Sequence, residues 1–200
     1  MKDKEIKLTF LGDISLNNKY NLLEENPFKE ITNIYNNTDF AVGNLESLLS
    51  GNEGLNIKKM PYLYSEENAY KWLRYLKLDL VSIAQNHIYD NFDSGFFRTL
   101  EYLKKSGLSY TGGYLKDFKL DKSYKVKIKD QNIGFINYCH PNTNFKKPEV
   151  TSIHLNVYNK EKIITHIENL KQKVDYIILL LHWGGKSDYG NFPKMEQVID

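Results

Sequence analysis

The amino-acid sequence predicts a single α/β domain, residues 1–200, built on a largely buried mixed sheet. Short apolar runs alternate along the chain with longer segments whose apolar residues recur at helical spacing. The runs are apolar at consecutive positions, which is typical of strands covered on both faces. A length of 200 residues suits one sizeable domain.

Four strands are expected in the first half of the chain. Each is a short run rich in Val, Ile, Leu or Phe that stops at a glycine or a polar residue. Helix-like segments separate the runs, an alternation typical of α/β folds. The predicted strands are residues 6–11, 39–42, 78–84 and 108–111.

Three helices are expected in the same half, at residues 27–35, 65–76 and 94–105. The first is predicted from Phe28, Ile31 and Ile34, which recur at spacings of three. Ser65 is the expected N-cap of the second, and the third is amphipathic. The polar, Gly- and Asn-rich residues 50–59 predict a loop.

The second half opens with a predicted hairpin, strands 124–128 and 132–137 joined around Asp130-Gln131. The strand at 174–181 is the most apolar of the chain. The remaining expected elements are a loop at 141–148, a helix at 159–172 and the start of a helix at 193–200.

Composition excludes several classes of protein. The 27 basic and 25 acidic residues nearly balance, whereas a nucleic-acid-binding domain usually carries a basic excess. Cys139 is the only cysteine, which excludes an internal disulfide and a Cys-rich zinc site. We expect no membrane span and no signal peptide, because no apolar run approaches about 20 residues and the N-terminus is charged. The expected location is the cytoplasm or, in association with the membrane, the cell surface.

Polar side chains that suit chemistry follow four of the predicted strands. In an open α/β sheet, ligands bind at the carboxyl ends of the strands, so these groups would share one pocket if the strands are neighbours. Their oxygen and nitrogen atoms suit Mg, Mn, Fe or Zn. The set comprises Asp13, Asn44, Glu46, Asn86, His87, Asp90 and His182.

Each member has a simpler interpretation when taken alone. An Asp or Asn after a strand is ordinarily a turn or capping residue. His182 follows five apolar residues and equally suits a hydrogen-bonded core histidine. The coincidence of four strand exits favours a site. We expect no functional role for His140, His154 or His166, although Cys139-His140-Pro141 could line a pocket.

Four sequence blocks resemble a known family. They are Phe10-Leu11-Gly12-Asp13, residues 40–46 from Phe40 to Glu46, residues 82–90 from Ser82 to Asp90, and His182-Trp183-Gly184. Their residues and order are similar to those of bacterial capsule synthesis proteins of the CapA type, from about residue 7 to the end of the chain. The resemblance implies a calcineurin-like metallophosphatase fold with α/β/β/α layers and mixed sheets.

The resemblance also implies roles for the seven residues. It implies two divalent ions (Mn, Fe, Zn or Mg), whose ligands would be Asp13, Asn44, Glu46, Asn86 and His182. A carboxylate, Asp13 or Glu46, would bridge the two ions. His87 would stabilise charge on phosphoryl oxygens or protonate the leaving group, and Asp90 would orient His87.

Three departures from the family pattern matter. Gln85 replaces the first Asn of an A-N-N-H block, and Lys186 stands where the family has an acid. The family continues into a G-H-x-P-H block that these 200 residues do not contain, and the final predicted helix has no cap. We therefore expect that the C-terminal part of the domain is missing.

Two functions are compatible with these observations. The first is a metal-dependent hydrolase or transferase of capsule biosynthesis, acting on a phosphoester or a linkage of poly-γ-glutamate or polysaccharide. The alternative is a non-catalytic domain that binds polymer or partners of the capsule machinery, which Lys186 and the missing block favour. The expected partners are a surface polymer or phosphoester and capsule synthesis proteins, with no nucleic acid.

Overall fold

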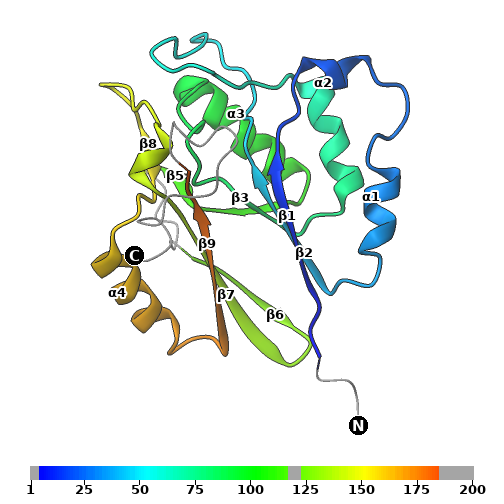
Figure 1. The fold of residues 1–200 in the computed structure, drawn as a ribbon, viewed down its shortest axis with the longest axis vertical. Coiled ribbons are helices and arrows are strands. Elements are labelled where there is room, and N and C mark those ends of the chain that lie inside the picture. Colours follow the sequence, from blue (N-terminus) through cyan, green and yellow to red (C-terminus); the bar gives the residue numbers. More distant parts are fainter. Residues whose placement is uncertain (1–4, 117–122, 185–200) are drawn as a thin grey trace.

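The computed structural model describes residues 5–116 and 123–184 of the chain. Two main sheets lie against each other, and helices cover their outer faces, which gives the α/β/β/α order of layers. The single helix of the last layer, α4 (Lys160–Leu170), lies on the opposite side of the molecule from α1 (Lys29–Ile34) and α2 (Glu67–Tyr70) (Figure 1).

The first sheet consists of the four strands predicted in the first half of the chain. Its order is β1 (Leu8–Ile14), β2 (Phe40–Leu45), β3 (Leu80–Ser82) and β4 (Ser109–Thr111), and all neighbours are parallel. Because the strands are parallel, their carboxyl ends meet at one edge. That edge carries the polar residues singled out after the first three strands, from Asp13 to Asp90, whereas His182 comes from the second sheet.

The second sheet contains the predicted hairpin. Strand β6 (Ser123–Ile128) pairs antiparallel with β7 (Gln131–Cys139), and β7 pairs parallel with β9 (Tyr176–His182). The second sheet is therefore mixed, as expected, whereas the first is all parallel, and the strands form two main sheets in place of a single one. Apolar strands buried on both faces do not reveal which sheet they join.

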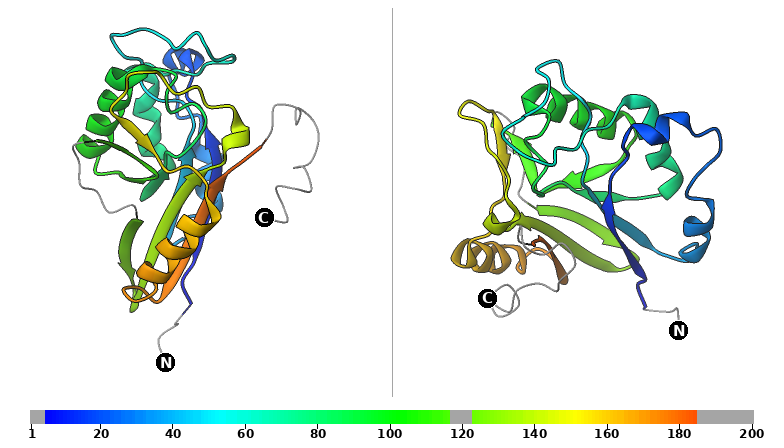
Figure 2. Two further views of the ribbon diagram at one scale, coloured as in Figure 1. Left: turned by 90° about the vertical axis from the view of Figure 1, so that its left-hand side faces the viewer. Right: turned by 45° about the horizontal axis from the view of Figure 1, so that its top comes forward.

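A third pairing was not predicted. Strand β5 (Gly113–Leu115) pairs antiparallel with β8 (Ile153–Leu155), on the same side of the molecule as α4 (Figures 1 and 2). Both strands are only three residues long, so neither shows a readable alternation. A 3-10 turn, η3 (Pro141–Thr143), lies in the predicted loop at 141–148.

Two helices differ from their predicted form. Helix α1 exists, but its buried side is formed by Phe28, Thr32 and Tyr35, while Ile31 and Ile34 are exposed. Ser65 is not a cap, because its buried hydroxyl lies 2.7 Å from the hydroxyl of Ser47. The predicted helix at 65–76 is α2 followed by a 3-10 helix, η2 (Lys71–Leu76).

The remaining helices follow the sequence more closely. Helix α3 (Phe92–Lys105) starts two residues before the predicted span, and α4 lies inside the predicted 159–172. The side chain of Asn159 caps α4 by accepting from the amide of Lys162 at 2.9 Å. A short 3-10 helix, η1 (Asn18–Leu22), precedes α1.

The apolar core has three parts that match the layers. Ile14, Leu45, Val81 and neighbours pack against the helices of the first layer. Between the sheets, Phe40, Val42 and Leu80 meet Ile128, Ile133 and Phe135. Under α4, Ile136 and Tyr138 of β7 meet Ile163 and Leu170. Burial of these side chains, at about 25 cal/mol per Å², is the main source of stability.

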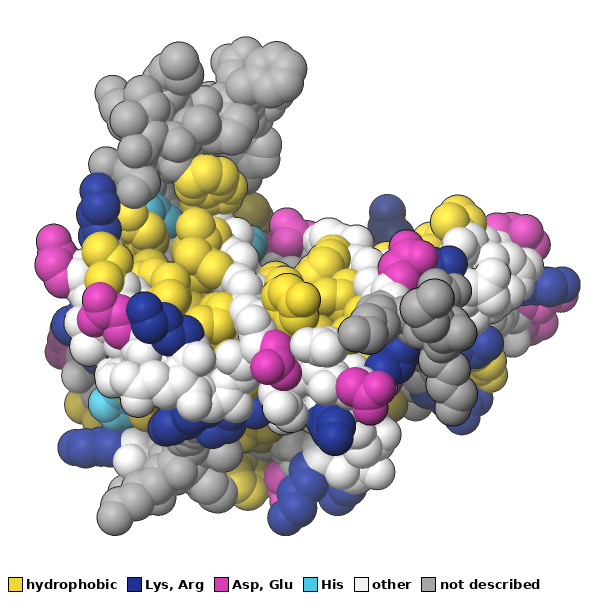
Figure 3. Space-filling model, turned by 90° about the horizontal axis from the view of Figure 1, so that it is seen from below, with side chains coloured by type: hydrophobic (Ala, Val, Ile, Leu, Met, Phe, Trp, Pro, Cys, Tyr) yellow, Lys and Arg dark blue, Asp and Glu magenta, His cyan; other side chains and the backbone are white. Residues whose placement is uncertain are grey.

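The space between the sheets opens at one side of the described structure. Strands β1 and β9 are edge strands, and Phe10 and Tyr176 are 48% and 58% exposed. A groove of about 500 Å³ runs there, with Ile6, Leu8 and Ile178 in its walls. Figure 3 shows hydrophobic side chains gathered on the face seen from below.

Some sequence expectations fall outside the described residues. The predicted helix at 193–200 and the position of Lys186 are among them. Within the described ranges, every helix is too short or too polar to cross a bilayer.

Candidate metal centre

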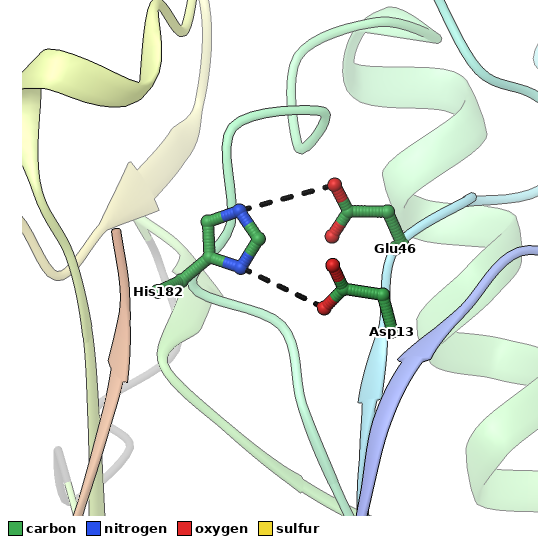
Figure 4. Close-up of side chains that lie close together, drawn as sticks. All are labelled: Asp13, Glu46 and His182. Atoms are coloured by element: carbon green, nitrogen blue, oxygen red, sulfur yellow. Dashed lines mark ion pairs between the residues drawn. The ribbon is translucent and has the colours of Figure 1, made fainter. Parts of the chain in front are cut away.

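Three potential metal ligands converge at the carboxyl ends of strands from both sheets. Asp13 comes from β1, Glu46 follows β2 directly, and His182 ends β9. Ligand atoms of all three lie within 4.8 Å of one another, and the side chains point toward a common space (Figure 4). The His182 ring faces both carboxylates, with Nδ1 3.9 Å from Asp13 Oδ1 and Nε2 3.8 Å from Glu46 Oε1.

A β-bulge in β1 sets the position of Asp13 in the centre. The pairing with β2 runs in register to Phe10 and Val42, then resumes with Asp13 opposite Asn44, so β1 holds one extra residue. This bulge includes Gly12, and it explains why Gly12-Asp13 resembled the end of a strand. The strand predicted to stop at residue 11 in fact continues to Ile14.

Asn137 of β7 ties the second sheet to the first beside the centre. Its Oδ1 accepts from the amide of Ala84 at 2.6 Å, and its Nδ2 donates to the carbonyl of Leu180 at 3.2 Å. Ala84 follows β3, and Leu180 lies in β9 close to His182. One buried amide therefore fixes the end of β9 relative to the first sheet.

Burial and like charge set the electrostatics of the centre. Burial, followed by the nearby Asp13 carboxylate, raises the pKa of Glu46 from 4.5 to about 8. Burial lowers the pKa of His182, which favours the neutral imidazole that binds metals. A cation placed here would offset the repulsion between the two carboxylates.

Asn44 links the two carboxylates. Its Nδ2 donates to Asp13 Oδ1 at 2.7 Å and to Glu46 Oε2 at 2.8 Å. Its Oδ1 accepts from the hydroxyl of Ser82 at 3.0 Å. In this arrangement the amide nitrogen of Asn44 faces the centre, and its expected role as an oxygen ligand stays a prediction.

Asn86 and His87 approach from the loop after β3. Asn86 Oδ1 lies 3.0 Å from His182 Nε2, so this amide oxygen borders the three-ligand cluster. His87 Nε2 lies 3.6 Å from Glu46 Oε1. His87 Nδ1 lies 2.6 Å from Asp90 Oδ2, and Asp90 is fully buried. The seven residues selected from the sequence thus lie together, and their individual roles stay predictions.

Three further residues of this region were not found from the sequence. Lys59, in the predicted loop at 50–59, is buried with its ammonium 3.5 Å from Asp90 Oδ1. Gln85 supports the loop after β3, donating to the carbonyl of Leu45 and accepting from the amide of His87. Asn137 lies in the middle of an apolar strand. A buried amide in an apolar run is a usable signal, whereas nothing in the sequence distinguishes Lys59 from Lys58.

The other histidines have different partners. His166 Nδ1 lies 2.8 Å from the hydroxyl of Tyr138, and the ring of His154 stacks on Tyr114. His140 accepts from the amide of Asn142. Burial raises the pKa of the Cys139 thiol to about 12, which makes it a poor nucleophile.

Comparison with known proteins identifies the family. The family model described as bacterial capsule synthesis protein PGA_cap matches residues 7–198. A curated relative, the capsule biosynthesis protein CapA of Bacillus anthracis, is 22% identical over 211 aligned positions, which cover 98% of this chain and 51% of CapA. The chain therefore spans about half the length of this relative.

A solved structure shares the fold. A putative 5′-nucleotidase from Staphylococcus aureus, solved in complex with α-ketoglutarate, matches with a TM-score of 0.55 at 16% identity, over 94% of this chain and 39% of the nucleotidase. A phosphatase from Mycoplasma pneumoniae matches with a TM-score of 0.48 at 18% identity, over 88% of this chain and 55% of its own. The layered metallophosphatase fold implied by the sequence is confirmed. With its blocks in order from β1 to β9, the chain belongs to the bacterial capsule synthesis protein family, PGA_cap.

Proposed function

We propose that this chain is the metal-dependent catalytic domain of a capsule biosynthesis protein, a hydrolase or transferase acting on a phosphoester or a capsule polymer linkage. The observation that carries the proposal is the convergence of Asp13, Glu46 and His182 from two sheets within 4.8 Å. Membership of the capsule synthesis family supports the biological role. The proposed partners are the surface polymer and other capsule synthesis proteins.

The donor set fits a divalent ion. Two carboxylates and a neutral imidazole suit Mg, Mn, Fe or Zn, and the amide oxygen of Asn86 lies beside them. The raised pKa of Glu46 also fits, because a buried carboxylate that holds a proton without metal can exchange it for a cation. When bound, such an ion supplies Lewis-acid activation of water and of a phosphoryl oxygen.

His87 and Asp90 supply proton chemistry in this proposal. His87 Nδ1 lies 2.6 Å from Asp90 Oδ2, so the Nε2 of His87 faces the Glu46 side of the centre. A protonated His87 can donate from Nε2 to a leaving-group oxygen, and Asp90 then stabilises the imidazolium. Asn44 holds the Asp13 and Glu46 carboxylates in fixed orientations.

The test measures metal content and turnover on one set of proteins. Protein purified without chelator is analysed for bound metal, and hydrolysis of bis(p-nitrophenyl) phosphate is followed with added Mn²⁺. We expect the wild-type protein to contain metal. Asp13→Asn and His182→Ala should lose it, and their turnover should fall by about 10²-fold or more. His154→Ala, whose ring stacks on Tyr114, is the matched histidine control and should behave as wild type.

The metal analysis also gives the number of ions. One equivalent identifies the three-ligand cluster alone, and two equivalents identify the paired centre that the family resemblance implies. Absence of metal binding at any concentration of Mn²⁺ or Zn²⁺ tested would overturn the proposal. Metal binding without turnover of phosphoesters or capsule polymer would instead support the alternative, a polymer- or partner-binding domain, which the lysine at position 186 favours.

A further inference from the structure

A buried lysine lies behind the proposed acid–base pair. The side chain of Lys59 is 2% exposed, and its ammonium donates to the backbone carbonyl of Asn86 at 2.7 Å. The same ammonium lies 3.5 Å from Asp90 Oδ1. Lysine is rarely buried unless it is paired, so this position requires a specific partner.

The loop that carries Lys59 is fastened to the segment that carries His87 and Asp90. The amide of Asn56 donates to the carbonyl of Asp90 at 2.8 Å, and the amide of Leu63 donates to Asp90 Oδ2 at 2.7 Å. Asn56 also anchors the loop by donating from Nδ2 to the carbonyl of Lys146. Hydrogen bonds at Asn56 and Leu63, before and after Lys59 in the chain, therefore hold the loop that positions the lysine.

Asp90 needs the charge of Lys59. Asp90 is fully buried, and its Oδ2 is engaged by Leu63 and His87. Among the described residues, Oδ1 of Asp90 accepts no hydrogen bond, and the ammonium of Lys59 lies 3.5 Å from it. A buried carboxylate without a compensating charge is strongly unfavourable, and the ammonium of Lys59 supplies that charge at 3.5 Å.

The Asp90 carboxylate, paired with Lys59, determines which ring nitrogen of His87 carries a proton. A carboxylate only accepts hydrogen bonds, so the ring nitrogen 2.6 Å away must be the one that carries the proton. That assignment leaves Nε2, the nitrogen 3.6 Å from Glu46, unprotonated in the neutral ring. We propose that Lys59 is a positioning residue that fixes His87 in the Nδ1-protonated tautomer through Asp90.

Lys59 does not act on a substrate itself. Its ammonium is buried, and its polar contacts are to the carbonyl of Asn86 and to Asp90 Oδ1. The tautomer of His87 is a property of the folded chain and needs no substrate. Only the catalytic consequence of this inference rests on the proposed function.

The experiment reads the tautomer directly. Protein labelled with ¹⁵N in the histidine rings is examined, free of metal, by long-range ¹H–¹⁵N correlation, and His87→Gln assigns the His87 signals among the five histidines. We expect a protonated Nδ1 and an unprotonated Nε2 in wild type. Lys59→Met and Lys59→Gln should shift the two ring nitrogens toward a mixture of tautomers, while Lys59→Arg should retain the wild-type pattern.

Lys58→Met is the matched control, because Lys58 is exposed and makes only a surface pair with Glu149 at 3.7 Å. Its His87 spectrum should equal wild type. A wild-type His87 protonated on Nε2 would overturn the inference without any variant. A folded Lys59→Met or Lys59→Gln protein with an unchanged tautomer would also overturn it, because Lys59 would then serve stability alone.

The kinetic consequence separates this inference from the proposed function. If the chain turns over phosphoesters, Lys59→Met should lower kcat by about 10-fold to 100-fold, less than the roughly 10²–10⁴-fold contribution of a complete acid–base group, and leave metal content unchanged. If the chain proves inactive, the proposed function fails while the tautomer result still decides the role of Lys59.

Discussion

Glu46 and His182 face each other across the two sheets, with 3.8 Å between Glu46 Oε1 and His182 Nε2. Glu46 follows β2 of the first sheet, and His182 ends β9 of the second. Their approach requires both sheets to present their carboxyl ends at the same place, and Asn137 holds that relationship. The predictions below test the charge, the link between the sheets and the packing around this pair.

Glu46 should make the metal-free protein less stable as pH rises. Its pKa is 4.5 in an ordinary environment and about 8 here, so the folded state holds a proton that the unfolded state releases between those values. The free energy of unfolding should therefore fall from about pH 4.5 to about pH 8 and level off above. Urea unfolding at a series of pH values measures this slope.

Glu46→Gln is the control for that slope, because the amide keeps the shape and does not titrate. The variant should be less pH-dependent than wild type across the same interval. Mn²⁺ should restore stability most strongly above pH 8, where Glu46 no longer holds its proton. Equal slopes for wild type and Glu46→Gln would contradict the assignment of the raised pKa.

Asn137→Ala should weaken both the fold and the centre. The substitution leaves the amide of Ala84 and the carbonyl of Leu180 without their side-chain partner in a buried region, at a cost of about 1–3 kcal/mol each. The apparent affinity for Mn²⁺ should also fall, because His182 is no longer fixed relative to Asp13. Urea unfolding and metal titration measure the two effects.

Asn132→Ala, in the exposed part of the same strand, is the control for Asn137. Its free energy of unfolding should stay within about 0.5 kcal/mol of wild type. A folded Asn137→Ala protein that binds Mn²⁺ as tightly as wild type would show that the link between the sheets does not hold the centre together.

Gly112→Ala should be far more destabilising than Gly107→Ala. Both glycines have positive φ, 106° and 69°, so alanine is strained at either position by about 1 kcal/mol. A Cβ on Gly112 would in addition collide with Asn137 Oδ1 and Ala84, whereas a Cβ on Gly107 meets nothing within 4 Å. Chemical unfolding of the two variants separates the strain from the collision, and equal losses would contradict the close approach at Gly112.

Asp90 and Lys59 should show strong coupling in a double-mutant cycle. Asp90→Asn alone leaves the buried ammonium of Lys59 uncompensated, and Lys59→Met alone leaves the buried carboxylate, each at about 3–5 kcal/mol. The double variant should cost less than the sum of the two single ones. Additive losses in urea unfolding would show that the two charges do not depend on each other.

Local patterns in the sequence were sufficient to predict the strand exits. Asp13, Glu46 and His182 were each predicted from an apolar run that ends in a polar group, and this pattern is visible within a few residues. The four blocks that resemble the family added a second signal, because they follow one another in the same order as in the family. The face of α1 was not predictable in the same way, because Ile31 and Ile34 are exposed and Thr32 is buried by contacts made far along the chain.

Long-range packing decided the rest of the centre. The sequence by itself determined which residues are candidates for metal-binding and acid–base chemistry, since side-chain type and position after a strand are local properties. Only the tertiary structure separated β7 and β9 from the first sheet, turned Asn137 into the link between sheets, and buried Lys59 against Asp90. The physical reason is that burial and charge pairing depend on contacts between distant segments, which a run of neighbouring residues does not encode.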